Sequence, residues 1–319
     1  MSYQEFISYQ DFIENVIAFF KEKLPTDADI KLHKITKNNG LHLDGLTIMT
    51  KETNISPNFY LNYYYEDYLE HGDLDKVLNL ILTSYKEQPQ LKTIDISFFT
   101  DFEKVKKNIA YKIVNFERNR ELLSEIPHIP YLDLAIVFFC LMNHEYFGNA
   151  TTLIRNQHLE LWQITDRELY QLAIENTPRL LPHHFLSMHD LLNDPELLSN
   201  LPEDVILQSS DNSESGCDAN QSHVESPMYV LSNQSKCFGA STILYLNLLE
   251  EIAEQFHSSF YLLPSSIHEV ILVPDSSPSK LKDYSNMVHE VNTNHVPDDE
   301  ILSDHAYFYN KDEKAIIYY

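Results

Sequence analysis

Residues 263–274 read LPSSIHEVILVP, a run of apolar residues between two prolines that opens on polar side chains. Residues 260–264, which overlap its start, read FYLLP and form a second short apolar run. Short apolar runs bounded by turn residues are typical of β-strands, and strands joined by a short turn pair antiparallel. The two runs, 260–264 and 268–274, therefore predict a β-hairpin.

Helical and strand patterns mix irregularly along the rest of the chain. Apolar residues at three- and four-residue steps predict helices over 4–24, from 74, over 166–176, over 240–256 and over 279–293. Other patterns predict strands within 29–50 around an Asn38-Asn39-Gly40 turn, over 134–142 and 228–233, near 306–309 and near 315–318. Because regular β-α-β alternation is missing, the order predicts an α+β fold with largely antiparallel sheets and packed helices.

The length of 319 residues exceeds the usual size of one domain, about 100 to 200 residues. We expect two α+β lobes, residues 1–125 and residues 126–319. Residues 208–227 are rich in Ser, Asp and Asn and lack periodicity, so they predict a flexible polar insertion in the second lobe.

Five tyrosines lie between residues 60 and 68, ahead of the helix that follows Asp73. Such a cluster can form a platform on which a ligand stacks, or it can pack against a neighbouring helix. We favour packing, with the hydroxyl groups at the rim of a core.

The charge of the chain is strongly negative, with 48 Asp and Glu against 23 Lys and Arg and a formal net charge of −25. Nucleic acid and anionic membranes are both repelled by such a surface, so we expect neither as a direct partner. The longest apolar run, residues 134–142, is too short to span a bilayer, and the N-terminus lacks the pattern of a secretory signal. Three cysteines without a CxxC pair fit a reducing compartment. These features predict a soluble cytoplasmic protein.

The chain has only six glycines, and this scarcity excludes several cofactor loops. No G-x-G-x-x-G is present, so the common dinucleotide-binding loop is missing. Gly40 and Gly45 have the spacing of a phosphate loop, but Leu46 takes the place of its essential lysine. We therefore expect no cofactor.

Ser265, Ser266, His268 and Glu269 bring nucleophile, base and carboxylate together at the entrance of the 268–274 strand. On a strand, Ser266 and His268 share one face, whereas Glu269 points to the other. An orienting carboxylate would have to come from elsewhere, and Asp44 and Asp133 are the candidates because their neighbours predict partial burial. The alternative, which we favour, is that the serines satisfy backbone groups at a turn after Pro264.

The densest group of metal-binding side chains comprises His183, His184 and His189, beside Asp190. Histidines at this spacing can share a metal, but the chain lacks the H-E-x-x-H pattern of zinc enzymes. We keep the three histidines as weak metal candidates and expect no metal.

Several segments of the chain carry a family resemblance, among them KNNGLHLDGLTI, NISPNFYLNYYYEDY, IPHIPYLDLAIVF, WQITDRELYQLAIENTPRLLP, LPSSIHEVILVP and EILSDHAYFY. Together these segments resemble a family of uncharacterised proteins from Firmicutes, common in gut Clostridia, that is described as a domain of unknown function. They cover most of the chain, so the resemblance implies full-length membership. It implies no catalytic residues, and a fainter likeness is to another uncharacterised bacterial family.

Three functions follow from these observations as hypotheses. The first is a non-catalytic binding or interaction protein with a protein or small-molecule partner, because no complete catalytic or cofactor motif is present. The second is a hydrolase-like enzyme that uses Ser266 and His268. The third is an acidic mimic of nucleic acid that occupies a basic partner.

Overall fold

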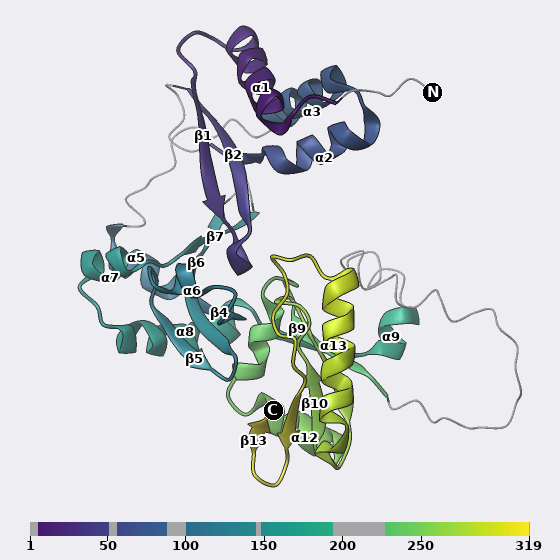
Figure 1. The fold of residues 1–319 in the computed structure, drawn as a ribbon. Coiled ribbons are helices and arrows are strands. Elements are labelled where there is room, and N and C mark those ends of the chain that lie inside the picture. The colour runs from purple at the N-terminus through teal and green to yellow at the C-terminus, as the bar shows by residue number, and fades with distance from the viewer. Residues whose placement is uncertain (1–5, 51–55, 88–99, 145–147, 194–226, 319) are drawn as a thin grey trace, which may run out of the picture. The chain divides into compact units, whose positions relative to one another are not determined.

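A computed structural model describes residues 6–50, 56–87, 100–144, 148–193 and 227–318, and the chain divides into two compact units (Figure 1). The first unit comprises residues 1–101 and 142–150, and the second comprises residues 102–141 and 151–319. The expected boundary after residue 125 lies between β4 (Ile109–Asn115) and β6 (Leu134–His144), which are paired in one sheet. Except for residue 227, the predicted insertion at 208–227 lies outside the described residues.

The first unit is a three-stranded antiparallel sheet with the order β1-β2-β3, together with its helices. Its elements are α1 (Tyr9–Lys23), β1 (Asp29–Thr36), η1 (Asn38–Gly40), β2 (His42–Met49), β3 (Phe59–Tyr60), α2 (Leu61–His71) and α3 (Leu74–Glu87). The predicted hairpin is confirmed. Asn39 and Gly40 have φ of 58° and 71°, the left-handed region that an Asn-Gly turn adopts at low cost. Helix α1 begins later than expected, because the Ser8 hydroxyl accepts a hydrogen bond from the Asp11 amide and caps it.

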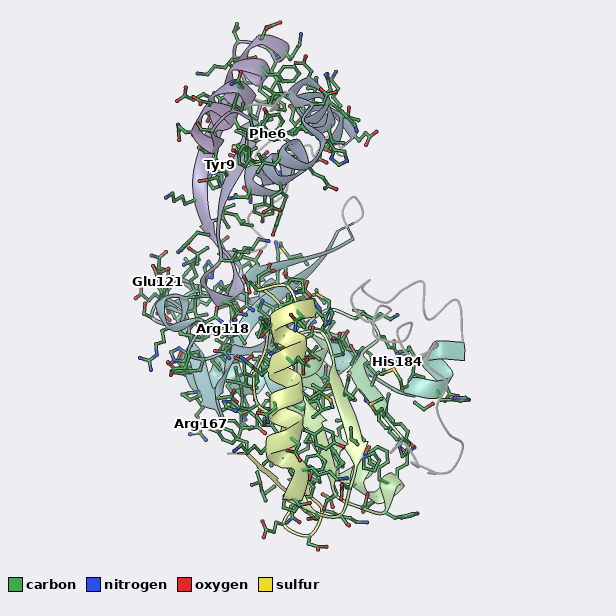
Figure 2. All side chains as sticks on the ribbon, turned by 45° about the vertical axis from the view of Figure 1, so that its right-hand side comes forward. Phe6, Tyr9, Arg118, Glu121, Arg167 and His184 are labelled. Atoms are coloured by element: carbon green, nitrogen blue, oxygen red, sulfur yellow. The ribbon has the colours of Figure 1, made fainter. Side chains whose placement is uncertain are left out.

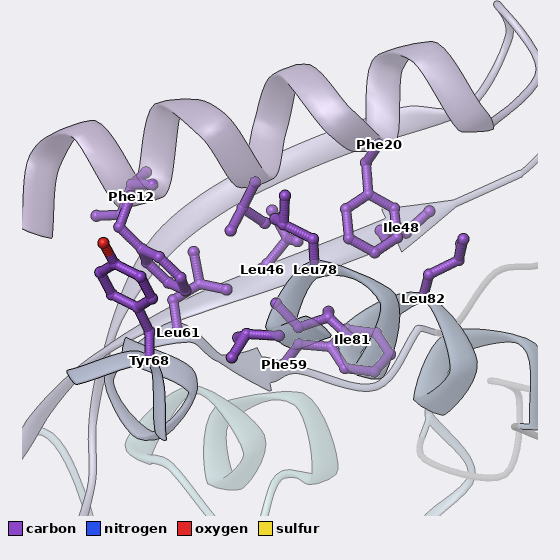
Figure 3. Packing of buried hydrophobic residues seen from close by; sticks show 13 residues of the cluster. Phe12, Phe20, Leu46, Ile48, Phe59, Leu61, Tyr68, Leu78, Ile81 and Leu82 are labelled. Atoms are coloured by element: carbon purple, nitrogen blue, oxygen red, sulfur yellow. The ribbon is translucent and has the colours of Figure 1, made fainter. Parts of the chain in front are cut away.

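Helices α1 and α3 bury their apolar faces against this sheet, and Phe12 and Phe20 point from α1 into the shared core (Figure 3). From the tyrosine cluster, Tyr68 is buried in this core, and Tyr64 and Tyr65 pack against it. The Tyr65 hydroxyl donates to the Ile7 carbonyl at 2.9 Å, and the Ile7 amide donates to the Tyr68 hydroxyl at 3.3 Å. Their rings pack and their hydroxyls fix a backbone segment, as the packing interpretation predicts.

The second unit contains a six-stranded antiparallel sheet with the order β13-β12-β10-β11-β9-β8. The elements of this part are β8 (His183–Ser187), α9 (Met188–Asn193), β9 (Tyr229–Asn233), η4 (Gly239–Leu244), α12 (Leu248–Phe256), β10 (Phe260–Leu263), β11 (Val270–Pro274), η5 (Pro278–Lys280), α13 (Leu281–His295), β12 (Tyr307–Asn310) and β13 (Ala315–Ile317). Helix α13 packs on one face through a cluster that includes Leu281, Val288 and Tyr261. On the opposite face, Phe256 of α12 contacts Phe185 and Tyr229.

A second antiparallel sheet of this unit has the order β4-β6-β5, with β7 also paired to β6. Its remaining elements are α5 (Phe102–Val105), η2 (Lys106–Asn108), α6 (Arg120–Leu123), β5 (His128–Tyr131), β7 (Gly148–Leu153), α7 (Asn156–Trp162) and α8 (Asp166–Leu180). Thr165 and Glu168 form the predicted capping box of α8. The helix continues past Pro178, contrary to the expected end near 176. The backbone carbonyl of Thr177 accepts a hydrogen bond from the Leu181 amide. The hydroxyl of Thr177 accepts a second hydrogen bond, from the Tyr111 amide of β4.

The α+β class and the antiparallel sheets are confirmed, and two further local predictions are wrong. The helix expected over 240–256 is divided into η4 and α12, because Asn247 adopts a left-handed φ of 62°. Strand β11 starts at Val270 instead of residue 268. None of the helices in the described ranges is both long and apolar enough to cross a membrane.

Candidate functional site

The imidazole of His268 belongs to a group of four side chains of the second unit. We call this group the His268 cluster: Lys112, Phe238, His268 and Glu300. Lys112 comes from β4, Phe238 from the turn before η4, and His268 from the turn between β10 and β11. Glu300 lies in the segment between α13 and β12. The cluster therefore joins four segments that are far apart in the sequence.

The imidazole of His268 is engaged at both nitrogens and on its face. Nε2 lies 3.6 Å from Oε1 of Glu300, and the Phe238 amide donates to Nδ1 at 3.4 Å. The Phe238 ring stacks on the imidazole with centroids 6.1 Å apart and planes 13° apart. The ammonium of Lys112 lies 4.0 Å from the Phe238 ring centroid, within the range of a cation–π contact.

The backbone beside the cluster is tightly packed at Gly239. The Ser232 hydroxyl donates to the His268 carbonyl at 2.7 Å, and a Cβ added at Gly239 would lie 2.1 Å from that hydroxyl and 2.3 Å from that carbonyl. Phe238 has a left-handed φ of 56°, which is uncommon for a bulky residue. The Asn233 amide group bonds both the carbonyl and the amide of Cys237. Only glycine therefore fits where this turn meets β9 and His268.

Ser266 does not share a strand face with His268, because both residues precede β11. Its hydroxyl accepts a hydrogen bond from the His268 backbone amide at 3.0 Å, and the residue is only 6% exposed. It also forms an isolated β-bridge with Ile301. The Ser266 hydroxyl thus bonds the main chain at His268, as the turn interpretation predicts.

The two carboxylates considered as orienting groups bond hydroxyl groups elsewhere. Asp44, in the first unit, accepts from the Tyr9 hydroxyl at 3.0 Å. Asp133, in the second unit, accepts from the hydroxyls of Ser303 at 2.7 Å and Tyr307 at 2.5 Å. The carboxylate that meets His268 is Glu300. It lies 32 positions along the chain from His268 (residues 268 and 300), and no local motif marks it.

The three histidines considered for metal binding lie on two elements. His183 and His184 are consecutive on β8, so their side chains point to opposite faces of the sheet, while His189 lies on α9. Within the described ranges, no three His, Cys, Asp or Glu side chains are grouped so that they could hold a metal ion.

Burial raises the pKa of both described cysteines. Cys140 lies inside β6, and its thiol pKa rises to about 12. Cys237 is half-buried, and burial outweighs the opposing effect of Lys112. A raised pKa keeps a thiol protonated at neutral pH, which is the reverse of what a thiol nucleophile needs.

A pocket lies next to the His268 cluster, on the face of β8 and β9, and His184, one of the residues that line it, is labelled in Figure 2. We call it the β8–β9 pocket. It is lined by His184, Leu186, Leu191, Val230, Ser232, Lys236 and Glu269. Ser232 lines the pocket and donates to the His268 backbone carbonyl, so the main chain at His268 is bonded to one of the lining residues.

The stability contributed by His268 and Glu300 is expected to depend on pH. Burial lowers the pKa of His268, but Glu300 and Glu269 outweigh it, so the net shift is upward from 6.5. The contribution is therefore fully present below pH 6.5 and is lost as the pH rises through the folded-state pKa. The pKa of Glu300 shifts in the opposite direction, because the contact with His268 lowers it from 4.5. The stability that Glu300 contributes is therefore lost only as the pH falls through this lowered pKa.

Urea unfolding of the wild type and Glu300→Gln between about pH 5.5 and pH 9 measures this dependence. We expect the wild type to be the more stable, with the largest difference at the acidic end of that range. The exposed Glu290 of α13 offers a matched control, Glu290→Gln, whose effect should not follow this profile. A difference for Glu300→Gln that is constant with pH would contradict the pairing.

Comparisons with known proteins give a family and no function. No curated protein matches the chain, and no solved structure matches it. The profile of the family of unknown function DUF5688 matches residues 9–311, which is nearly the whole length. The chain therefore belongs to the DUF5688 family, as the sequence resemblance predicts.

Proposed function

We propose that this protein is a non-catalytic binding protein of the bacterial cytoplasm, and that the β8–β9 pocket is its binding site. The proposal rests on the contacts made by the side chains that could take part in catalysis. His268 contacts Phe238 and Glu300 through its two nitrogens, and the Ser266 hydroxyl accepts the His268 amide. These groups hold local structure beside the pocket instead of pointing a nucleophile at a substrate.

The pocket has the composition of a binding site for a small molecule. Its lining includes the aliphatic side chains Leu186, Leu191 and Val230, together with polar residues, Lys236 and Glu269 among them. A mainly apolar surface with a few convergent polar groups is the usual make-up of a ligand site. Backbone pairing of β8 with β9 and of β9 with β11 fixes most of this surface, so the site is formed before a ligand arrives.

Thermal unfolding in the presence of a panel of small metabolites tests the proposal. We expect at least one compound to raise the melting temperature of the full chain, because ligand binding to the folded state stabilises it. Val230→Thr places a hydroxyl among the aliphatic side chains of the pocket and should weaken the binding of that compound several-fold. Lys282→Met on α13 should leave its binding unchanged. Stabilisation that is equal in wild type and Val230→Thr would place the ligand elsewhere and refute the assignment of the site.

A hydrolase-like activity is the second candidate, and the contact between His268 and Glu300 favours it. A carboxylate beside an imidazole orients the ring in hydrolytic triads. If Ser266 were the nucleophile, Ser266→Ala and His268→Ala would both abolish hydrolysis of ester, peptide or phosphodiester substrates. Activity that survives Ser266→Ala would reject this mechanism.

The acidic-mimic hypothesis rests on the net charge of −25 and stays a prediction. A basic protein bound through this charge should dissociate steeply as salt increases. Salt-independent binding of a partner would exclude it.

A further inference from the structure

Strand β1 forms one edge of the three-stranded sheet of the first unit. The strand order is β1-β2-β3, so β2 pairs with one side of β1, and no strand in the described ranges pairs with its other side. Six of the eight residues of β1 are exposed. A long, exposed edge strand presents a row of backbone groups to which a further strand can add. The outer side of β1 is therefore a candidate docking site.

The hydrogen bonds of β2 show which backbone groups of β1 face outward. The amides of Asp44 and Ile48 donate to side-chain oxygens outside the β1–β2 ladder, so both amides point away from β1. Register places Lys34 opposite Asp44 and Ile30 opposite Ile48. In an antiparallel ladder, both members of such a pair direct their backbone groups away from each other. The outward N–H and C=O groups of β1 are therefore those of Ile30, Leu32, Lys34 and Thr36.

Two side chains beside these backbone groups are open to a partner. Leu32 and Lys34 lie two residues apart and thus on the same face of the strand. Leu32 is 40% exposed. Among the residues that the structure describes, none forms an ion pair with Lys34, whereas Lys31 pairs with Asp29 at 2.6 Å. The edge therefore offers an apolar contact at Leu32 and a cation at Lys34 that a carboxylate can meet.

The charge of this edge disfavours a second copy of the chain as the occupant. Residues 29–37 carry three lysines and one aspartate, although the whole chain has a net charge of −25. Pairing two β1 strands would bring two such basic segments together. Lysines on an edge strand oppose self-pairing of this kind, and like charges on paired strands are destabilising. A strand that carries a carboxylate instead complements the edge.

We propose that the outer edge of β1 binds an extended segment of another protein, which adds to the sheet as an antiparallel strand. The segment has a carboxylate opposite Lys34 and, two residues later, an aliphatic side chain opposite Leu32. Its backbone exchanges hydrogen bonds with both of these residues. The site lies in the first unit and is separate from the β8–β9 pocket, so the inference goes beyond the proposed function.

Binding of a labelled peptide to the full chain, followed by fluorescence anisotropy, tests the inference. The peptide Thr-Val-Glu-Thr-Leu-Thr-Val-Thr, with blocked termini, has its glutamate opposite Lys34 and its leucine opposite Leu32. We expect a dissociation constant below about 1 mM. N-methylation of the peptide's leucine removes an amide that faces β1 and should weaken binding at least about tenfold. N-methylation of the threonine before it, whose amide faces away from β1, should have little effect.

A charge exchange locates the peptide on the edge. Lys34→Glu should weaken the peptide about fivefold or more, because an attraction becomes a repulsion. A second peptide with lysine in place of its glutamate should regain that loss on Lys34→Glu and bind the wild type weakly. Lys282→Glu, at an exposed position of α13, is the matched control and should change neither affinity. Circular dichroism and melting temperatures show whether both variants fold.

Three outcomes would overturn the inference. The first is no binding of the peptide at concentrations up to about 1 mM. The second is binding that neither the N-methylated leucine nor Lys34→Glu weakens. The third is a dimer, seen by sedimentation, that Leu32→Pro makes monomeric by removing an outward amide, since the occupant is then a second copy. A ligand of the β8–β9 pocket that Val230→Thr weakens would still support the proposed function, so the two failures are distinguishable.

Discussion

Gly239→Ala is expected to lower the free energy of unfolding of the second unit by about 3 kcal/mol or more. The added Cβ would lie 2.1 Å from the Ser232 hydroxyl, 2.3 Å from the His268 carbonyl and 2.8 Å from the Asn233 amide. Two of these atoms belong to the backbone and cannot turn away. Equilibrium unfolding in urea measures the loss.

Two further variants show that the backbone contacts cause this loss. Gly45→Ala adds the same methyl group, but its closest contact is the end of the Ile35 side chain, which can rotate, so we expect about 1 kcal/mol or less. Adding Ser232→Ala to Gly239→Ala removes one contact and leaves both backbone contacts. Full recovery of stability in this double variant would contradict the explanation.

Asp133→Ala is expected to cost about 2 to 4 kcal/mol, because it removes the carboxylate that accepts hydrogen bonds from two buried hydroxyl groups. Ser303 and Tyr307 are both fully buried and both donate to this carboxylate. Burial and the nearby charge of Asp133 raise the pKa of Tyr307 well above 10, so its hydroxyl remains a donor at neutral pH. The bonds join the β5–β6 turn to β12 and to the segment just before it, and thus connect the two sheets of the second unit.

A double-mutant cycle isolates the bond to Tyr307. Tyr307→Phe should cost less in the Asp133→Ala background than in the wild type, with a coupling energy of about 1 kcal/mol or more. Arg118, labelled in Figure 2, forms a nearby ion pair with Asp304 and offers a control, because its exposed guanidinium should contribute under about 1 kcal/mol. Additive effects of Asp133→Ala and Tyr307→Phe would show that the hydroxyl bond is not the source of the loss.

Local sequence signals predicted secondary structure well where residues close together in the chain determine it. The Asn38-Asn39-Gly40 turn and the Thr165 capping box act over a few residues, and the structure confirms both. The prediction of helix boundaries failed where contacts between distant segments determine the structure. Helix α8 continues through Pro178 while the hydroxyl of the neighbouring Thr177 bonds β4. The break at Asn247 has no glycine or proline to mark it.

The candidate site was predicted in part. His268 stood out because its neighbours are capable of catalysis, but the sequence offers 48 carboxylates and no means of selecting Glu300. The β8–β9 pocket depends on strand register between segments that are far apart in the chain. Strand β8 itself lies in a histidine-containing stretch that we interpreted as a metal candidate. Spatial pairing, which one sequence does not reveal, was the missing information.

We propose that His268 holds local structure beside the β8–β9 pocket and does not catalyse a reaction. The most direct test measures turnover of a broad ester, peptide and phosphodiester panel by purified wild type and His268→Asn, alongside their melting temperatures. We expect that neither protein exceeds the uncatalysed rate and that His268→Asn melts at a lower temperature, because the contacts to Phe238 and Glu300 are weakened. Turnover by the wild type that His268→Asn abolishes while remaining folded would contradict it.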